Sequence, residues 1–532
     1  MEPAPDFTIE TPADPSHGDF ATNVAMVSAK AFHMAPRKIA EALSPYFEFS
    51  GTYFEKFEIA GPGFINFFLS PRFYAAVLQD IEALQDGYGR SDFGKGKKIN
   101  VEFVSANPTG PLHVGHGRGA AAGDSLARIL RRAGYDVTTE YYINDAGRQM
   151  RILGMSVWYR LRNLVGRTMA EPEDYYRGSY ITDIAKEMLE KDPSLADASD
   201  EDGKERCYEY AKNEILEGIK KDLRDFRVEH QNWFSEKTLV DGGLVDKAFQ
   251  ALKDAGYTYE KDGALWFATS RLGDDKDRVL RKSDGSLTYF ASDIAYHHNK
   301  FERGFDWLID VWGADHHGYV PRMRAAIEAM GKGKKNFDVV LIQLVNLLIN
   351  GQPVSMSTRA GTFETLADVV REVGADAARF MFLSRKTDSP VDFDLEAVKQ
   401  RTMENPVYYV QYAHARVAAL LRRAAEEGVT IPDVSDDAAL AGLTLPDDMA
   451  LLRKMALYRD MLEQAATTLS VHHVSHYLME LSQLLHSYYT KNQILKAGDP
   501  VTTGSRLALL RAVSRVIANG LDLMGVSAPD HM

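Results

Sequence analysis

The sequence predicts an α/β protein built on a parallel sheet, with a smaller α+β domain before it and an all-α helical-bundle domain after it. A β-branched strand over 99–104, a helix over 114–133 and a strand over 137–143 form a strand–helix–strand unit, and such units build parallel sheets. Before it, helical patterning over 25–43 alternates with the strand-like run 63–69. From about residue 400 the strand signals disappear.

The length of the chain requires several domains. It has 532 residues, and a single core supports roughly 100–200. We expect domains over 1–92, 93–398 and 399–532, with the glycine- and lysine-rich stretch 94–98 as a linker. The mostly helical, charged stretch 150–250 indicates an insertion in the middle domain.

Composition excludes some classes of protein and leaves others open. A formal net charge of −13 is unlike that of a nucleic-acid binder, although a local basic face can still bind a phosphate backbone. The single cysteine, Cys207, excludes an intrachain disulfide and a multi-cysteine zinc site. With no run of about 20 apolar residues and an acidic, proline-bearing start, we expect a cytoplasmic protein with no membrane partner.

The remaining elements follow from local signals. The helix over 114–133 ends at Gly134, a typical C′ residue. The runs 307–312 and 341–349 each read as one buried strand. Asn405 and Pro406 fit the N-cap and first position of a long helix. The last helix carries a core-facing stripe at helical spacing, made of Leu507, Leu510, Val513, Ile517 and Leu521.

The segment His113-Val114-Gly115-His116 lies where the strand–turn unit meets a helix N-terminus. A helix N-terminus favours phosphate, because its N–H groups are unpaired and carry partial positive charge. Gly115 leaves room for a nucleotide base to approach the backbone. This arrangement suits adenylyl transfer, in which charge builds on the α-phosphate. Histidine pairs at this spacing also occur simply as solvated helix ends.

Several segments together resemble the bacterial arginyl-tRNA synthetases of class I. These are Val101–His116, Tyr141–Gly147, Ser355–Phe363, Asn405–Arg416 and Pro15–Asn23. The resemblance spans nearly the whole chain and implies an N-terminal tRNA-binding domain, a Rossmann-like catalytic domain and a C-terminal anticodon-binding domain. Compared with the family pattern, the extreme N-terminus is short, and we expect its first helix to be missing.

The resemblance also implies roles for individual residues. Catalytic roles fall on His113, Gly115, His116, Met356, Ser357 and Arg359, and substrate contacts on Glu102, Ser105, Asn107, Tyr289, Asp293, Asp315, His316 and His317. Asp293 and Glu102 would pair with the guanidinium of arginine, as carboxylates do, and Tyr289 would frame it. Ser105 and Asn107 would hold the α-amino end. The alternative is a surface carboxylate at Asp293 and a core aromatic at Tyr289.

One loop departs from the general class I pattern KMSKS. Ser355 and Thr358 stand where that pattern has lysines, and Arg359 is the residue expected to supply the missing charge. A zinc site built from His316 and His317 is the less favoured alternative. The expected cofactor is ATP with Mg²⁺ held mainly by the phosphates.

The C-terminal domain offers residues for RNA contact. Tyr408, Tyr412 and Arg416 combine aromatic and cationic side chains, which suit unpaired loop bases, although such side chains also serve as core or solvated residues. The expected partners are tRNA(Arg), L-arginine and ATP, with no DNA, and the resemblance implies a monomer that needs bound tRNA for arginine activation.

Two other classes of protein remain as alternatives. One is a non-catalytic tRNA-binding relative, in which the altered loop has abolished activation. The other is a small-molecule adenylyltransferase, which would have no use for the two RNA-binding domains. The related cysteinyl branch of class I binds its substrate through zinc, for which this chain lacks the ligands.

Overall fold

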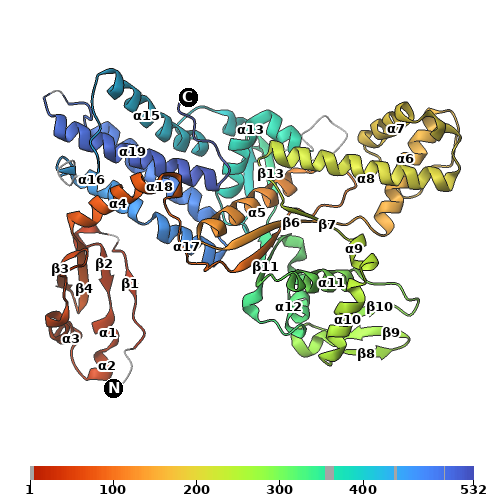
Figure 1. The fold of residues 1–532 in the computed structure, drawn as a ribbon, viewed down its shortest axis with the longest axis horizontal. Helices are drawn as coiled ribbons and strands as arrows, with labels where there is room; N and C mark the ends of the chain where they lie inside the picture. Colours follow the sequence, from red (N-terminus) through yellow and green to blue (C-terminus); the bar gives the residue numbers. More distant parts are fainter. Residues whose placement is uncertain (1–4, 13, 354–364, 436–439, 497) are drawn as a thin grey trace. The chain divides into compact units, whose positions relative to one another are not determined.

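The computed structural model describes residues 5–12, 14–353, 365–435, 440–496 and 498–532. Figure 1 shows the helices and strands of the chain. The chain divides into two compact units, each built from several segments. The first contains Met1–Tyr88, Leu420–Leu457 and Leu484–Val516, and the second contains Gly89–Ala419, Tyr458–Gln483 and Ile517–Met532. No helix in the described ranges is long and apolar enough to span a bilayer.

The first unit begins with a small antiparallel sheet. Its strand order is β1 (Ile9–Glu10), β2 (Phe20–Thr22), β4 (Phe64–Leu69), β3 (Phe54–Ala60). The helices α1 (Val24–Val27), α2 (Ala29–Phe32) and α3 (Pro36–Leu43) lie along it, and Ala25, Ile39, Ala40 and Ile65 form the core between them. The predicted strand and helical patterning of this segment are therefore confirmed.

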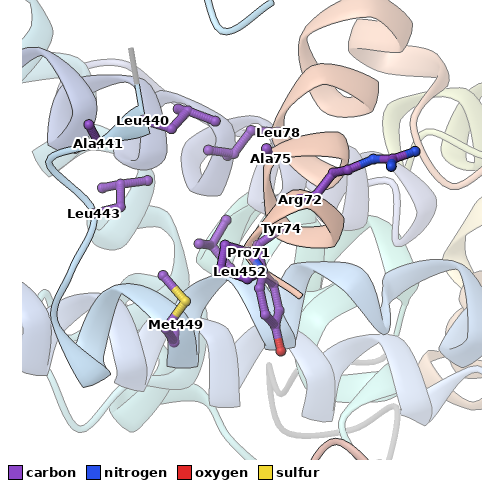
Figure 2. A pocket seen from close by; sticks show the side chains of 10 residues that line it. All are labelled: Pro71, Arg72, Tyr74, Ala75, Leu78, Leu440, Ala441, Leu443, Met449 and Leu452. Atoms are coloured by element: carbon purple, nitrogen blue, oxygen red, sulfur yellow. The ribbon is translucent and has the colours of Figure 1, made fainter. Parts of the chain in front are cut away.

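A polar cluster and a cavity lie beside α4 (Pro71–Leu84) in the same unit. Arg453, on α16 (Pro446–Ala456), donates to the Asp19 carboxylate at 2.7 Å, and the Tyr74 hydroxyl donates to the same oxygen at 2.6 Å. The cavity has a volume of about 340 Å³ (Figure 2). It is lined by Pro71, Arg72, Tyr74, Ala75, Leu78, Leu440, Ala441, Leu443, Met449 and Leu452. The described residues that line it are mostly apolar and include no carboxylate, histidine, lysine or cysteine.

The second unit is built on a five-stranded parallel sheet. Its order is β12 (Phe337–Ile342), β11 (Trp307–Gly313), β5 (Lys98–Glu102), β6 (Asp136–Ile143), β7 (Asn232–Ser235). The helix α5 (Val114–Arg132) connects β5 to β6, which confirms the predicted strand–helix–strand unit. Because β5 pairs with β6 on one side and with β11 on the other, the strand order reverses there, and ligands bind at such points in open α/β sheets.

The stretch after β6 is helical, as predicted, but only in part. The helices α6 (Arg148–Leu164), α7 (Ser179–Lys191) and α8 (Asp200–Asp225) are followed by β7, which returns to the main sheet before residue 250. Two short helices come next, α9 (Lys237–Asp241) and α10 (Leu244–Asp254). A separate antiparallel sheet follows, made of β8 (Thr258–Lys261), β9 (Ala264–Phe267) and β10 (Arg278–Arg281). The helices α11 (Tyr289–Glu302) and α12 (Val320–Ala329) flank β11 in sequence.

The prediction of one strand over 341–349 is wrong. The run contains the end of β12 and the whole of β13 (Val345–Ile349), which belong to different sheets. Strand β13 pairs with β14 (Gln352–Pro353) and β15 (Val391–Asp394). Between the strands, the Gln343 amide donates to the Thr387 carbonyl at 2.8 Å and the Leu344 side chain is 72% exposed. The run is mostly apolar, and its two polar residues, Gln343 and Asn346, were not interpreted as a break.

The last part of the chain is helical, with α13 (Leu366–Leu383), α14 (Leu395–Lys399), α15 (Pro406–Glu426), α17 (Tyr458–Thr468), α18 (His472–Lys491) and α19 (Pro500–Leu523). The helix α15 begins at the predicted proline. Asn405 does not cap it through its side-chain oxygen; its amide donates instead to the carbonyls of Val398 and Gln400, both at 2.8 Å. The five residues of the predicted core-facing stripe on α19 are all fully buried, which confirms it.

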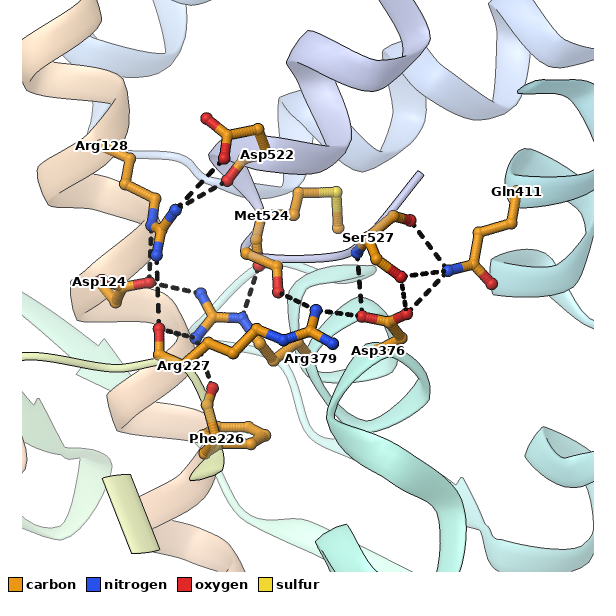
Figure 3. Close-up of polar contacts among 11 residues, drawn as sticks. Asp124, Arg128, Phe226, Arg227, Asp376, Arg379, Gln411, Asp522, Met524 and Ser527 are labelled. Carbon is orange, nitrogen blue, oxygen red and sulfur yellow. Dashed lines mark hydrogen bonds and ion pairs between the residues drawn. The ribbon is translucent and has the colours of Figure 1, made fainter. Parts of the chain in front are cut away.

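The C-terminal segment is tied to the sheet unit through buried charges (Figure 3). Arg379, on α13, is fully buried. It donates to the Met524 carbonyl and to the Asp124 carboxylate on α5, both at 2.6 Å. Asp376 accepts from the Ser527 amide at 2.9 Å. The segment after α19 therefore packs against α5 and α13 within the second unit.

Candidate active site

The predicted histidine pair forms a reciprocal cap at the start of α5. The Nδ1 atom of His113 accepts from the amides of Gly115 and His116 at 3.1 and 3.4 Å, and Nδ1 of His116 accepts from the His113 amide at 3.2 Å. The two rings stack with centroids 3.6 Å apart. Three backbone donors at the turn into the helix are thus satisfied by the histidines themselves.

This arrangement fixes the protonation of both rings. Because each Nδ1 accepts a hydrogen bond, a neutral ring must carry its proton on Nε2. Burial lowers the pKa of His113; burial and the neighbouring His113 lower the pKa of His116 to about 4. Near pH 7 the pair is therefore neutral and offers two Nε2–H donors, which can bind a phosphate oxygen without adding positive charge.

The structure gives a second reason for a glycine at position 115, in addition to the predicted one. A Cβ at this position would lie 3.0 Å from two atoms of the His113 ring, which is tighter than ordinary van der Waals contact. The glycine therefore allows His113 to fold over the first turn. Its predicted role in admitting a nucleotide base stays a prediction.

A strained turn connects β5 to the histidine pair. Val104 and Ser105 have φ values of 71° and 41°, and a β-branched residue in the left-handed region is a genuine outlier. The Ser105 hydroxyl donates to Glu102 at 2.8 Å and accepts from the Tyr142 amide at 3.1 Å, so these bonds hold the turn. Asn107 is half-buried, and its side chain has no hydrogen-bond partner in the part of the chain that the structure describes.

Four carboxylates surround the Tyr142 side chain. Burial and the charges of Glu236, Asp293, Glu102 and Asp145 raise the pKa of the Tyr142 hydroxyl. Each of the four has a hydroxyl partner. Ser105 donates to Glu102 as described above, Ser235 to Asp145 at 2.7 Å, Tyr319 to Asp293, and Ser292 to Glu236.

Within the described ranges, Asp145, Glu236 and Asp293 make no ion pair with a lysine or arginine. Burial raises the pKa of both Glu236 and Asp293. Burying a carboxylate is costly unless it is paired, so the four carboxylates around Tyr142 have the electrostatic character of a site for a cationic ligand. This group of residues is called the carboxylate pocket below.

Glu102 differs from the other three carboxylates because it already has a cation. Lys300, on α11, is fully buried and donates to Glu102 at 2.6 Å. The same ammonium donates to Asp310, on β11, at 3.1 Å. Asp310 in turn contacts His297 at 2.7 Å. Glu102 thus connects the carboxylate pocket to Lys300, Asp310 and His297, and its bond from Ser105 connects it to the strained turn.

The predicted residues of α11 and its surroundings lie as follows. Tyr289 is 73% exposed, so it is not a core aromatic, and Asp293 follows it one helical turn later. Asp315, His316 and His317 occupy the short helix η6 (Ala314–Tyr319) directly after β11 and are exposed. In the described ranges, no cluster of three or more histidine, cysteine, aspartate or glutamate side chains could hold a metal ion.

Two predicted groups remain. Met356, Ser357 and Arg359, with the altered positions Ser355 and Thr358, fall outside the described residues. Tyr408, Tyr412 and Arg416 form a half-buried column on α15. The two tyrosine rings lie 5.7 Å apart at an interplanar angle of 7°, and the Arg416 guanidinium lies 6.0 Å from the Tyr412 ring. Such a column can stack with an unpaired base.

Glu236 was not predicted from the sequence, although it lies on the same pocket. It is 8% exposed and precedes α9, in the residue after β7. Because β7 is a short strand within a helical, charged stretch, its membership of the main sheet was not predicted. A polar residue at the carboxyl end of a recognised parallel strand would have been the available signal.

Comparison with known protein families shows the class of protein to which this chain belongs. The catalytic domain of class I (R) tRNA synthetases matches residues 79–420, which is more than half of the chain and contains the parallel sheet and the histidine pair. The arginyl-tRNA synthetase N-terminal domain matches residues 2–69, and the DALR anticodon-binding domain matches residues 410–532. The chain is a class I aminoacyl-tRNA synthetase.

Individual relatives give the family. The arginine–tRNA ligase of Desulfovibrio desulfuricans is 64% identical over 524 residues, 98% of this chain and 95% of that protein. That of Nitratidesulfovibrio vulgaris is 62% identical over 525 residues, with 99% and 95% covered. The Thermus thermophilus arginyl-tRNA synthetase shares the fold, with a TM-score of 0.72 at 24% identity, covering 99% of this chain and 96% of that one. This chain belongs to the arginyl-tRNA synthetase family.

Proposed function

We propose that this chain joins L-arginine and ATP to form arginyl-adenylate and pyrophosphate, and then transfers arginine to the 3′-terminal adenosine of tRNA(Arg), releasing AMP. The observation that carries the choice of amino acid is the carboxylate pocket around Tyr142. Three of its acids have hydroxyl partners and no lysine or arginine among the described residues. A guanidinium stays charged at any working pH and pairs with carboxylates through two parallel N–H donors.

The pocket supports a division of roles within the substrate site. Asp293 and Glu236 are proposed to bind the guanidinium, and the exposed Tyr289 to frame it. Glu102 faces the same pocket but is already bound by Lys300, so its share of the substrate charge is smaller. Ser105 and Asn107, which follow β5, are proposed to hold the α-amino end.

The histidine pair is proposed to serve the adenylation step. A carboxylate oxygen of arginine attacks the α-phosphorus of ATP, and the bond from that phosphorus to the pyrophosphate oxygen breaks. The Nε2–H groups of His113 and His116 would donate to phosphate oxygens as charge builds there. Mg²⁺ would neutralise the phosphates, and with no metal-binding cluster in the described ranges, phosphate oxygens and water would be its main ligands.

The helical domain is proposed to bind the anticodon loop, with Tyr408, Tyr412 and Arg416 as contacts. The match of residues 410–532 to an anticodon-binding domain supports this proposal. A cytoplasmic monomer that binds neither DNA nor membrane is the corresponding proposal for its cellular setting, because the substrates ATP, arginine and tRNA are cytoplasmic in bacteria.

Exchange of labelled pyrophosphate into ATP, measured with each of the twenty amino acids and with or without tRNA, tests the proposal. Of the twenty amino acids, we expect only arginine to drive exchange, and only when tRNA is present. Exchange driven by another amino acid would contradict the assignment of the pocket. Silence under every condition, with tRNA binding intact, would favour the non-catalytic tRNA-binding relative.

A further inference from the structure

A chain of four ionisable side chains begins at Glu102, one member of the carboxylate pocket. Lys300 donates to Glu102 at 2.6 Å and to Asp310 at 3.1 Å, and His297 Nε2 lies 2.7 Å from the other Asp310 oxygen. His297 is 3% exposed, Glu102 8%, and Lys300 and Asp310 are fully buried. The residues come from β5, α11 and β11, so the chain joins the helix of the pocket to two central strands.

The partners of His297 determine its protonation. Its Nδ1 lies 2.7 Å from the backbone carbonyl oxygen of Asp293, an atom that can only accept. Its Nε2 faces Asp310, whose other oxygen accepts from Lys300. Although burial opposes ionisation, Lys300 and His297 hold the pKa of Asp310 at about 2, so this carboxylate also only accepts. Two acceptors at hydrogen-bond distance require a proton on each ring nitrogen, and the ring is therefore an imidazolium.

With His297 protonated, the four side chains together carry no net charge. Two cations, His297 and Lys300, balance two anions, Asp310 and Glu102. Burial raises the pKa of Glu102, and the Lys300 ammonium at 2.6 Å favours its ionised form. Removing one member of a buried ion pair leaves an uncompensated charge, which is far more costly than removing both members together. Each of the four groups therefore depends on the others for its ionisation and its position.

We propose that His297 and Lys300 are positioning residues for arginine activation. The imidazolium holds the backbone of Asp293 through Nδ1 and fixes Asp310 through Nε2. Asp310 and Lys300 then orient Glu102, whose second oxygen accepts from Ser105 in the strained turn that leads to His113. One buried network thereby sets both the pocket and the approach to the histidine pair. The role rests on the proposed function, whereas the protonation state does not.

The proposal has a consequence for alkaline pH. The charged groups that face the ring are Asp310 on β11, Glu102 on β5, and Lys300 and Asp293 on α11. Burial and Lys300 oppose protonation, but the carboxylates prevail and the pKa of His297 is raised. The stabilisation is complete below the unfolded pKa of about 6.5 and is lost as the pH rises through the higher folded value. Arginine-dependent exchange should fall with it.

The protonation state can be measured directly on the wild-type protein. The histidines are labelled with ¹⁵N, and a His297→Gln sample assigns the two resonances that disappear. At pH 7.5 we expect both His297 nitrogens to show the shift of a protonated imidazolium nitrogen. One nitrogen with the shift of an unprotonated ring atom would overturn the inference, and neither outcome depends on whether arginine is the substrate.

A charge-matched pair of variants tests the positioning role. His297→Gln leaves one buried negative charge in excess, and Asp310→Asn removes the acceptor that holds the Nε2 proton of His297; each should lower kcat/KM for arginine about 10- to 100-fold. The double variant is neutral again, with Lys300 and Glu102 still paired, and should recover at least about tenfold over either single change. In the double variant, the rate of arginine-dependent exchange should also no longer fall at alkaline pH.

Additive losses in the double variant, or an unchanged pH profile, would show that these side chains act only through packing. Failure of the proposed function would appear differently, as a wild-type protein that shows no arginine-dependent exchange. A single variant that does not fold would leave the wild-type resonance measurement and the double variant to decide.

Discussion

Replacing Arg379 by methionine should loosen the C-terminal segment from the catalytic unit. The guanidinium is fully buried and donates to Asp124 and to the Met524 carbonyl, both at 2.6 Å, and to the Phe226 carbonyl at 3.1 Å. Methionine has a similar length but no donors, so these three acceptors lose their partner while the packing volume is roughly kept.

The expected loss of stability in Arg379→Met depends on the hydrogen bonds that Asp124 keeps. Removing one partner of a buried ion pair costs about 3–5 kcal/mol. Asp124 keeps its bond from Arg128 at 2.9 Å, so we expect the lower end, about 3 kcal/mol. For a unit of roughly 370 residues, an unfolding entropy of about 2.1 cal/mol/K per residue converts this to a fall in Tm of about 4 °C.

Differential scanning calorimetry of the full chain measures this shift, and Arg128→Met is the matched control. Arg128 binds the same carboxylate, but its side chain is 30% exposed, so its loss should cost about 1 kcal/mol. If Arg379→Met lowers Tm no more than Arg128→Met does, the buried ion pair of Arg379 and Asp124 contributes no more to stability than the exposed one. That result would refute the expected loss of about 3 kcal/mol.

Three further predictions concern the site. Glu236→Gln should raise KM for arginine in pyrophosphate exchange about 10- to 100-fold and leave KM for ATP unchanged, because only the guanidinium loses a charged partner. Tm should fall as the pH is lowered from 6.5 to about 4, since unfolded His116 binds a proton in that window and folded His116 does not. Tyr412→Ala should weaken tRNA binding about tenfold or more in a filter assay, as one stacked base contributes about 1–3 kcal/mol.

Each of these has a control and a contrary result. An unchanged KM for arginine in Glu236→Gln would remove that residue from the pocket. His116→Asn lacks the titrating ring and should show a shallower fall in Tm between pH 6.5 and 4; an equal fall would assign the effect to other groups. Arg423→Ala changes an exposed arginine of α15 that pairs with Glu427, and equal loss of tRNA binding there and in Tyr412→Ala would indicate a general charge or stability effect.

The strand–helix–strand unit was predictable because its signals are local. The β-branched strand, the glycine-bearing turn and the stop at Gly134 each reflect the conformational preference of a few neighbouring residues. The position of the histidine pair followed directly from these boundaries. The reciprocal cap was not predictable, because it depends on which ring nitrogen each side chain turns toward the backbone.

The missed features depend on contacts between distant parts of the chain. The break at Gln343 is set by its bond to Thr387, and hydrophobicity along one run cannot reveal that two halves join different sheets. Glu236 and Lys300 were likewise missed. Their environment is created by the meeting of β7, α11 and β5, and a single sequence gives no distance between those segments.

The interleaved make-up of the two units bears on how the chain can be divided for experiment. The helices α15, α18 and α19 each contribute residues to both units, and the final segment Ile517–Met532 belongs with the parallel sheet. A fragment cut near residue 400 would carry Tyr458–Gln483 and that final segment away from their packing partners. Apolar side chains that are buried in the whole chain, such as Leu478 and Leu521, would then meet water, so expression of separated halves should yield aggregation unless both halves are made together.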